Sequence, residues 1–257
     1  MRSTESLQAG PGRFPPAARL CAGLFLVLPA VFTALLLAIG PAMAAQQPLP
    51  AHADAAPGYV VLLDAAHGGP EPGARLTPQL LEKDLTLALS IRLRSRLAAR
   101  GIAVVTTREQ DNDPDADARA AAANRSHAAA CLLLHATTSG TGVHLYTSSL
   151  APASAPRAGS PRPWATAQAG YLTQSLKLAS DVSEALAHAG IPVTLGSVSL
   201  QPADSMACPA VLVEAAPMLP RRGEAAAALS DPAYQGRLVD ALAGALEQWR
   251  ADWKAQP

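Results

Sequence analysis

The chain has 257 residues, which is enough for one domain of good size or for two small ones. Its 20 basic residues balance its 20 acidic residues, so no basic field points to nucleic acid as a partner. Aromatic residues make up only 4% of the chain and alanine is abundant, which favours a helix-rich α/β protein over an all-β one.

Residues 1–44 are typical of a signal peptide. Basic residues precede an uncharged apolar run at 20–40, and Ala42 and Ala44 follow with the A-x-A spacing of a cleavage site. The run is also long enough to cross a bilayer as an uncleaved membrane anchor. In both cases the rest of the chain leaves the cytoplasm. We therefore expect a periplasmic or extracellular protein, attached to the membrane only if this segment is retained.

The rest of the chain predicts a flexible linker at 45–57 and one domain at 58–254. Leucines four residues apart from Leu85 to Leu97 form one helical stripe, and Gly101 is a good helix stop. Strands alternate with helices, which predicts an α/β fold with a mostly parallel central sheet flanked by helices, with room for an antiparallel addition. We expect strands near 58–64, 102–108, 128–138, 142–148 and 207–217, helices near 82–100, 118–126, 168–188 and 231–254, and a low-complexity loop at 151–163.

Two cysteines follow the signal segment, Cys131 and Cys208, both in or beside apolar strand-like runs. In an oxidising compartment they can pair, but two buried free thiols are at least as good an interpretation, because cysteine is often simply a small core residue. No C-x-x-C spacing is present, so the cysteines do not predict a metal site.

Three of the predicted strands end on a residue that can bind a metal or move a proton, namely His67, His135 and Glu214. Because the carboxyl ends of parallel strands share one edge of a sheet, these side chains are expected to meet. Glu82 opens the first helix near the same edge. Two imidazoles and one carboxylate form a common catalytic zinc shell, and a second carboxylate can serve as general base.

The same residues belong to six motifs that follow one another along the chain. They are VLLDAAHGG, the stretch from EKDLTLALS to REQD, ARAAAANRS, LLLHA, GVHLY and PAVLVE. Together, over roughly residues 59–253, they resemble the zinc-dependent N-acetylmuramoyl-L-alanine amidases of the type 3 class. The resemblance implies Zn²⁺ held by His67, Glu82 and His135, Glu214 as catalytic acid/base, and peptidoglycan as substrate.

The chain departs from that family near the predicted site. Thr137 stands where the family usually has Asn. After Glu214 the family often has Gly-Phe followed by a polar residue, whereas this chain has Ala215–Pro220. All four metal and catalytic positions are intact, so the departures concern substrate contacts. Thr137 and His144 are candidates for such contacts, and His144 is alternatively an exposed residue on the face of its strand.

Charged residues around the site are expected to have supporting roles. We interpret Arg108 and Arg119 as structural charge partners of nearby carboxylates such as Asp111, and Asp64 as a group that ties down the turn carrying His67.

Three functional hypotheses follow. The first is a zinc amidase acting on peptidoglycan. The second is an exported cell-wall binding or regulatory module on the same fold, with little turnover. The third is another zinc hydrolase, since His/Glu/His shells also serve peptidases. The sequence leaves open whether a protein activator is a partner.

Overall fold

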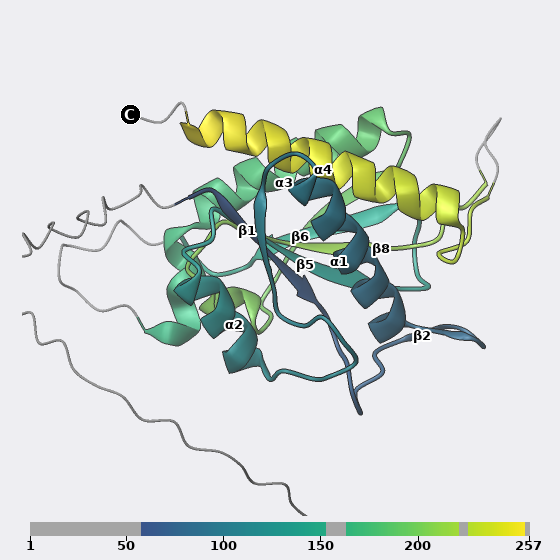
Figure 1. Cartoon of the computed structure of the whole chain (residues 1–257), viewed down its shortest axis with the longest axis horizontal. Helices are drawn as coiled ribbons and strands as arrows, with labels where there is room; N and C mark the ends of the chain where they lie inside the picture. Colours follow the sequence, from purple (N-terminus) through teal and green to yellow (C-terminus); the bar gives the residue numbers. More distant parts are fainter. Residues whose placement is uncertain (1–57, 153–162, 221–225, 255–257) are drawn as a thin grey trace, which may run out of the picture. The chain divides into compact units, whose positions relative to one another are not determined.

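The computed structural model describes residues 58–152, 163–220 and 226–254 (Figure 1). The predicted signal peptide and linker lie outside the described residues, as does most of the predicted loop at 151–163. Among the described helices, none combines the length and the apolar character that a membrane span requires.

Six strands form the central sheet, in the order β4-β1-β5-β8-β6-β7. Neighbouring strands are parallel except for β6 and β8, which are antiparallel, so the predicted mostly parallel sheet with an antiparallel addition is confirmed. The strands are β1 (Val60–Ala65), β4 (Ala103–Thr106), β5 (Ala130–Ala136), β6 (Val143–Ser148), β7 (Val193–Val198) and β8 (Ala210–Ala215). A separate two-stranded ribbon pairs β2 (Arg75–Thr77) with β3 (Leu80–Leu81).

Helices cover the two faces of the sheet unequally (Figure 1). Three long helices pack on one face: α1 (Glu82–Ala98), α3 (Leu172–His188) and α4 (Pro232–Lys254). The other face carries the shorter helix α2 (Ala116–Arg125) with the 3₁₀ segments η1 (Trp164–Gly170) and η2 (Ala203–Ser205). The site residues that lie on strands, described below, point toward this second, less covered face.

The leucine stripe explains how the first helix is seated. Leu85, Leu89, Leu93 and Leu97 are all buried in the larger hydrophobic core, against β1 and β5. Four leucines of this kind contribute roughly 1.5–3 kcal/mol each relative to exposed side chains. Just beyond the helix, Gly101 adopts a positive φ of 67°, which glycine tolerates best. The predicted helix is therefore confirmed, and its packing fixes its first residue, Glu82, at the carboxyl edge of the sheet.

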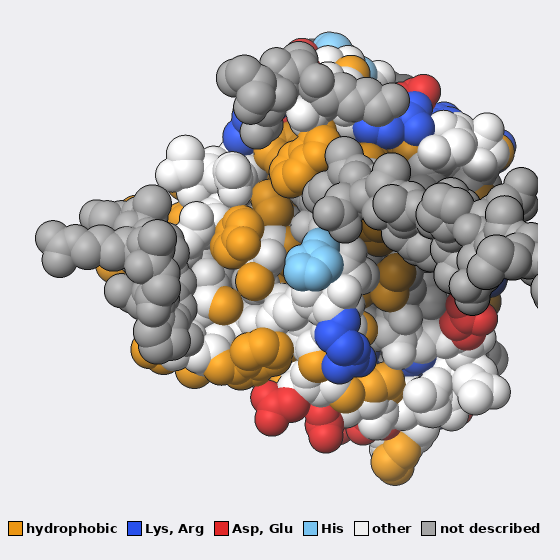
Figure 2. Space-filling view, turned by 60° about the vertical axis from the view of Figure 1, so that its left-hand side comes forward, with side chains coloured by type: hydrophobic (Ala, Val, Ile, Leu, Met, Phe, Trp, Pro, Cys, Tyr) orange, Lys and Arg blue, Asp and Glu red, His pale blue; other side chains and the backbone are white. Residues whose placement is uncertain are grey.

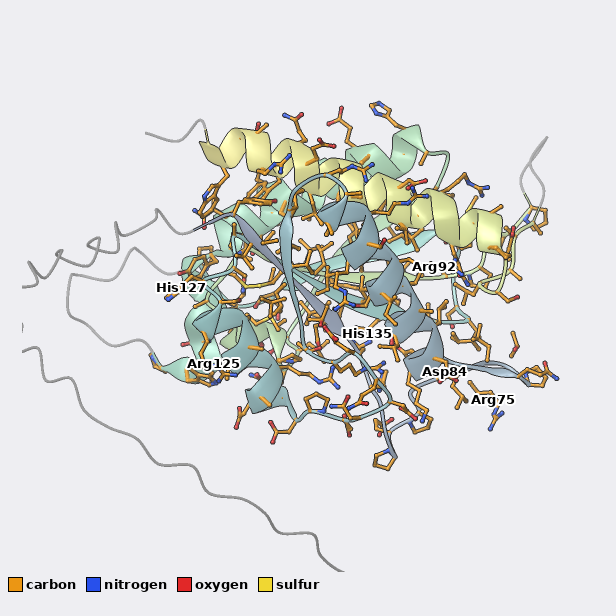
Figure 3. All side chains as sticks on the ribbon, viewed as in Figure 1. Arg75, Asp84, Arg92, Arg125, His127 and His135 are labelled. Atoms are coloured by element: carbon orange, nitrogen blue, oxygen red, sulfur yellow. A yellow bond between two sulfur atoms is a disulfide. The ribbon has the colours of Figure 1, made fainter. Side chains whose placement is uncertain are left out.

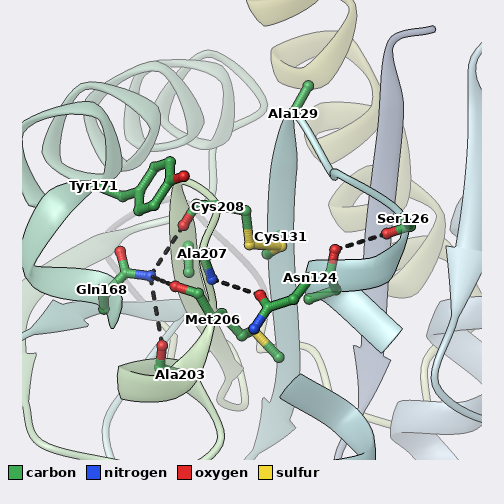
Figure 4. The surroundings of a disulfide bond; sticks show 12 residues. Asn124, Ser126, Ala129, Cys131, Gln168, Tyr171, Ala203, Met206, Ala207 and Cys208 are labelled. Carbon is green, nitrogen blue, oxygen red and sulfur yellow. Dashed lines mark hydrogen bonds between the residues drawn. A yellow bond between two sulfur atoms is a disulfide. The ribbon is translucent and has the colours of Figure 1, made fainter. Parts of the chain in front are cut away.

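Cys131 and Cys208 form a disulfide on the α2 face of the sheet (Figure 4). The bond ties β5 to the segment before β8, across 77 residues of sequence. Beside it, the buried amide of Gln168 donates to the carbonyl oxygens of Met206 and Cys208, at 2.9 Å and 3.0 Å. The alternative of two free thiols is wrong: the pairing of β5 with β8 brings Cys208 beside Cys131, and their sulfur atoms are bonded.

Candidate metal centre

The carboxyl edge of the sheet brings the four predicted residues to one region. His67 follows β1 by two residues, Glu82 is the first residue of α1, and His135 and Glu214 lie in the last two residues of β5 and β8. Register pairs His135 directly with Glu214. Their preceding same-face neighbours, Leu133 and Leu212, belong to the core on the α2 face, so both site residues point to that side. Figure 3 labels His135 among the side chains of the domain.

Glu82 is the centre of the cluster. Its Oε2 lies 3.1 Å from Nε2 of His67, and its Oε1 lies 3.0 Å from Nδ1 of His135. The backbone N–H groups of Ala74 and Ala136 donate to the same two oxygens, at 2.9 Å and 3.0 Å. Both carboxylate oxygens are thus held from two sides, which fixes the side chain in one orientation.

Electrostatics keeps the buried Glu82 carboxyl ionised. Burial by itself raises the pKa of Glu82, but the hydrogen bonds from His135, His67 and the two backbone amides outweigh it and lower the pKa well below its ordinary value. The hydrogen bond to Glu82 raises the pKa of His67, although partial burial opposes that shift. Glu82 is therefore ionised, and the ionised carboxylate is the form that binds a metal ion.

The three donor groups fit a metal ion. Their ligand atoms lie within 4.8 Å of one another. A tetrahedral zinc shell with bonds of about 2.0–2.1 Å places neighbouring ligands about 3.3 Å apart. Nε2 of His67 lies 3.1 Å from Oε2 of Glu82 and Nδ1 of His135 lies 3.0 Å from Oε1, so each imidazole is at about that separation from one of the two carboxylate oxygens. Two nitrogens and one oxygen are also the donor types that catalytic zinc sites use.

The turn that carries His67 has an unusual backbone. His67 adopts a φ of 60°, a left-handed conformation that is uncommon for residues other than glycine, and Gly68 and Gly69 follow with positive φ as well. Such strain persists only where surrounding contacts hold it, and it concentrates at functional sites. The glycine pair after β1 thus lets the chain reverse and present the imidazole to Glu82.

Sequence reasoning missed Gly73, which packs directly against two of the ligands. Its φ is 64°, and a Cβ placed there would lie 2.5 Å from Cδ2 of His67 and 2.6 Å from Oε2 of Glu82. Only a residue without a side chain fits this position. The Pro-Gly pair in the sequence indicates a turn, but not its closeness to the site.

A buried ion pair between Asp64 and Arg119 holds the turn that carries His67. Nη1 of Arg119 lies 2.7 Å from Oδ1 of Asp64, and Nη2 of the same guanidinium donates to the carbonyl oxygen of His67 at 3.0 Å. Asp64 and Arg119 are both buried. The prediction that Asp64 ties down this turn is confirmed, and it acts through Arg119.

The predicted partnership of Arg108 with Asp111 holds only at longer range: the two charges interact, but no ion pair joins Arg108 to a carboxylate in the described part of the chain. Its guanidinium donates to the carbonyl oxygens of Ala65, Ala66 and Lys83 rather than to a carboxylate. Asp111 pairs instead with the amine of Lys83, at 2.7 Å. Arg108 thus cross-links the backbone after β1 to the first turn of α1.

His144 is not the exposed strand residue that its alternating pattern allows. Antiparallel pairing of β6 with β8 places it opposite Glu214, and its Nδ1 lies 2.7 Å from Oε2 of that residue. Its side chain is only 13% exposed. Thr137 lies on the turn after β5, where its hydroxyl accepts a hydrogen bond from the N–H of Ser139 at 3.2 Å. Substrate contact by either residue stays a prediction.

A cavity of about 360 Å³ opens beside the cluster. It is lined by Asp64, Ala66, His67, Glu71, Asp113, Pro114, Asp115, Ala116, Arg119, His135, Leu200, Gln201 and Pro202. Another cavity, of about 410 Å³, lies at the opposite, amino-terminal edge of the sheet, around Gly58, Ala129 and Pro209. None of the predicted site residues lines this second cavity. Figure 2 shows one face of the molecule, on which apolar side chains gather.

The chain is an α/β domain with a His–Glu–His cluster and a further carboxylate at one edge of its sheet. This is the arrangement of a candidate metal-dependent hydrolase. Residues 61–248 match the family Amidase_3, described as N-acetylmuramoyl-L-alanine amidase. Because this match spans more than half of the chain, the protein belongs to that family. A comparison with curated proteins finds no match.

Solved amidase structures share the fold. Ami1 from Mycobacterium smegmatis superposes with a TM-score of 0.60 at 22% identity, covering 76% of this chain and 98% of that one. CwlV from Bacillus (Paenibacillus) polymyxa gives 0.57 at 19%, covering 75% and 98%. CwlD from Clostridioides difficile, solved in complex with the GerS lipoprotein, gives 0.53 at 17%, covering 76% and 99%. These likenesses confirm the predicted fold class.

Proposed function

We propose that the protein is a zinc-dependent enzyme that hydrolyses the amide bond between N-acetylmuramic acid and L-alanine in peptidoglycan. The observation that carries the proposal is the cluster of His67, Glu82 and His135 beside Glu214, in a chain that belongs to the amidase family. In this proposal the first three residues hold Zn²⁺ and Glu214 is the catalytic acid/base.

Each residue has a distinct chemical task. Zinc bound to the cluster would lower the pKa of a water molecule toward neutrality and polarise the scissile carbonyl. Glu214 takes a proton from the attacking water and returns it to the nitrogen of L-alanine as the C–N bond breaks. The products are a lactyl carboxylate on the glycan and a stem peptide with a free amino end.

The electrostatic setting suits this division of tasks. Glu82 receives four hydrogen bonds or close imidazole contacts, so its lowered pKa reserves it for holding charge rather than moving protons. Glu214 is bonded through one oxygen only among the described residues, and its side chain is 26% exposed. A partly exposed carboxylate with a free oxygen can exchange protons with water and substrate.

We propose an exported location, periplasmic or extracellular, or a membrane-anchored one with the domain outside the cytoplasm. Support comes from the basic flank, the apolar run and the A-x-A site within residues 1–44. The disulfide between Cys131 and Cys208 is consistent with an oxidising compartment. Cell fractionation with sequencing of the mature N-terminus tests this: a soluble exported form beginning at Ala45 indicates cleavage, and an intact membrane-bound form indicates an anchor.

A protein activator is a further proposal for this chain. Its support is that the similar CwlD was solved in complex with the GerS lipoprotein. Affinity purification from the native cell envelope, with and without added peptidoglycan, tests whether a protein partner co-purifies and raises turnover.

The decisive experiment is digestion of purified peptidoglycan by the zinc-loaded protein, followed by mass spectrometry of the soluble products. Release of stem peptides that begin with L-alanine is expected for the wild type. The matched control is Glu214→Gln, which is expected to bind zinc stoichiometrically and to release no peptide. Sedimentation with peptidoglycan without any release would contradict the enzyme proposal and favour the cell-wall binding module.

A further inference from the structure

His144 contacts Glu214 because of how three strands are ordered. β8 lies between β5 and β6, so Glu214 has His135 as its register partner on one side and His144 on the other. The neighbours of His144 in sequence, Val143 and Leu145, are buried in the core of the opposite face. Alternation along the strand therefore turns His144 toward the same face as Glu214 and His135.

The contact engages one half of the Glu214 carboxylate. Nδ1 of His144 lies 2.7 Å from Oε2, within the range of a charge-assisted hydrogen bond. Within the described residues, Oε1 of Glu214 has no hydrogen-bond partner. A carboxylate held through one oxygen keeps the other free in a fixed direction.

The far side of the His144 ring is closed by backbone. Gly140 has a φ of 78°, and a Cβ placed there would collide with Nε2 and Cε1 of the ring. The ring of Tyr146 stands edge-on at 6.5 Å between centroids. With Nε2 facing the Gly140 backbone and Nδ1 facing Glu214, the ring is placed to hold the carboxylate rather than to reach a substrate.

We propose that His144 is a positioning residue for Glu214: its Nδ1–H donates to Oε2, fixes the carboxylate and leaves Oε1 free to accept a proton. The inference rests on the proposed function, in which Glu214 is the acid/base. It gives His144 a role that does not require contact with substrate. Groups that orient an active residue in this way change activity by about 10- to 100-fold when removed.

Steady-state kinetics of variants of the full-length protein test the role, with zinc content measured for every variant. His144→Leu is expected to lower kcat about 10- to 100-fold with KM within about twofold of the wild type. His144→Asn, whose amide nitrogen can occupy the place of Nδ1, is expected to recover most of kcat.

A second readout is independent of turnover and of metal. In ¹⁵N spectra of the metal-free protein, Nδ1 of His144 is expected to show the protonated tautomer and to shift on Glu214→Gln. His127 and His188, which lie outside the site, serve as internal controls that do not shift. This measurement decides the pairing even where a variant is too unstable for kinetics.

The outcomes separate the two proposals. A wild type that releases no stem peptide refutes the proposed function, and the positioning role with it. An active wild type with unchanged kcat in His144→Leu refutes the positioning role alone. An unprotonated Nδ1 that ignores Glu214→Gln also refutes it.

Discussion

Substituting Gly73 by alanine is expected to damage the metal site through a single added methyl group. The new Cβ would lie 2.5 Å from Cδ2 of His67 and 2.6 Å from Oε2 of Glu82. Ordinary contacts between such atoms are about 3.5–4.0 Å, so at least one ligand must move by about 1 Å. Metal sites tolerate ligand distances within about 0.2 Å of ideal. We therefore expect Gly73→Ala to weaken zinc binding by at least 10- to 100-fold, or about 1.4–2.7 kcal/mol.

A matched control separates this clash from backbone strain. Gly101 has nearly the same φ as Gly73, 67° against 64°, but a Cβ added there meets no atom within 4 Å. Gly73→Ala and Gly101→Ala should both lose about 1–2 kcal/mol of folding free energy, because alanine disfavours the left-handed conformation. Only Gly73→Ala should lose zinc affinity.

The assay is zinc titration against a chelator of known affinity, alongside urea unfolding of the metal-free proteins. Equal zinc affinity in the two alanine variants would refute the reasoning, because it would mean that Gly73 does not constrain the ligands. Loss of affinity in Gly101→Ala as well would also contradict it, since the effect would then come from general destabilisation.

Three further outcomes are expected. Replacing Cys131 and Cys208 together by alanine removes a cross-link across 77 residues, and the free energy of unfolding in urea should fall by about 4.5 kcal/mol on the chain-entropy account. Adding reductant to the wild type should lower its unfolding midpoint to that of the variant. An unchanged midpoint would contradict the estimate. Asp64→Ala leaves the buried guanidinium of Arg119 without its carboxylate, so unfolding free energy should fall by about 3–5 kcal/mol, whereas the same stability as wild type would show that the pair contributes nothing. Glu82→Gln should abolish stoichiometric zinc binding, read by elemental analysis after dialysis, because it removes the charge that both imidazoles share; retained zinc would disprove its role as a ligand.

The departures from the family now have a structural location. Thr137 follows β5 at the site edge, and its hydroxyl is engaged by the N–H of Ser139 within its own turn. In the segment after Glu214, Ala216 is buried, and Met218 is buried and pairs with Ala227. These residues therefore contribute to local packing. The peptidoglycan digest measures whether they also affect turnover.

Much of the site follows from local pattern. His67, His135 and Glu214 each end an apolar run, and any parallel sheet brings such ends to one edge. Glu82 follows from a helix start close to that edge. The structure places three of these four residues within metal-binding distance of one another and the fourth on the neighbouring strand. Their chemical roles stay predictions until zinc binding and turnover are measured.

Other features depend on contacts that no local pattern contains. β7 was missed because five of its six residues are exposed, so neither alternation nor an apolar run marks it. The pairing of His144 with Glu214 requires β6 to be antiparallel to β8, a choice made between segments 70 residues apart. Whether Cys131 and Cys208 pair likewise depends on which strands become neighbours.

The amino-acid sequence by itself determined the α/β class, the alternating strands and helices, and the residue types available for a His–Glu–His site. These are local properties, set by hydrophobic period, helix stops and strand ends. Only the tertiary structure decided the order of the strands, and with it the disulfide, the closeness of Gly73 to the ligands and the hold of His144 on Glu214. The physical reason is that each of these is a contact at a few ångströms between distant segments, and such contacts exist only once the whole sheet has packed.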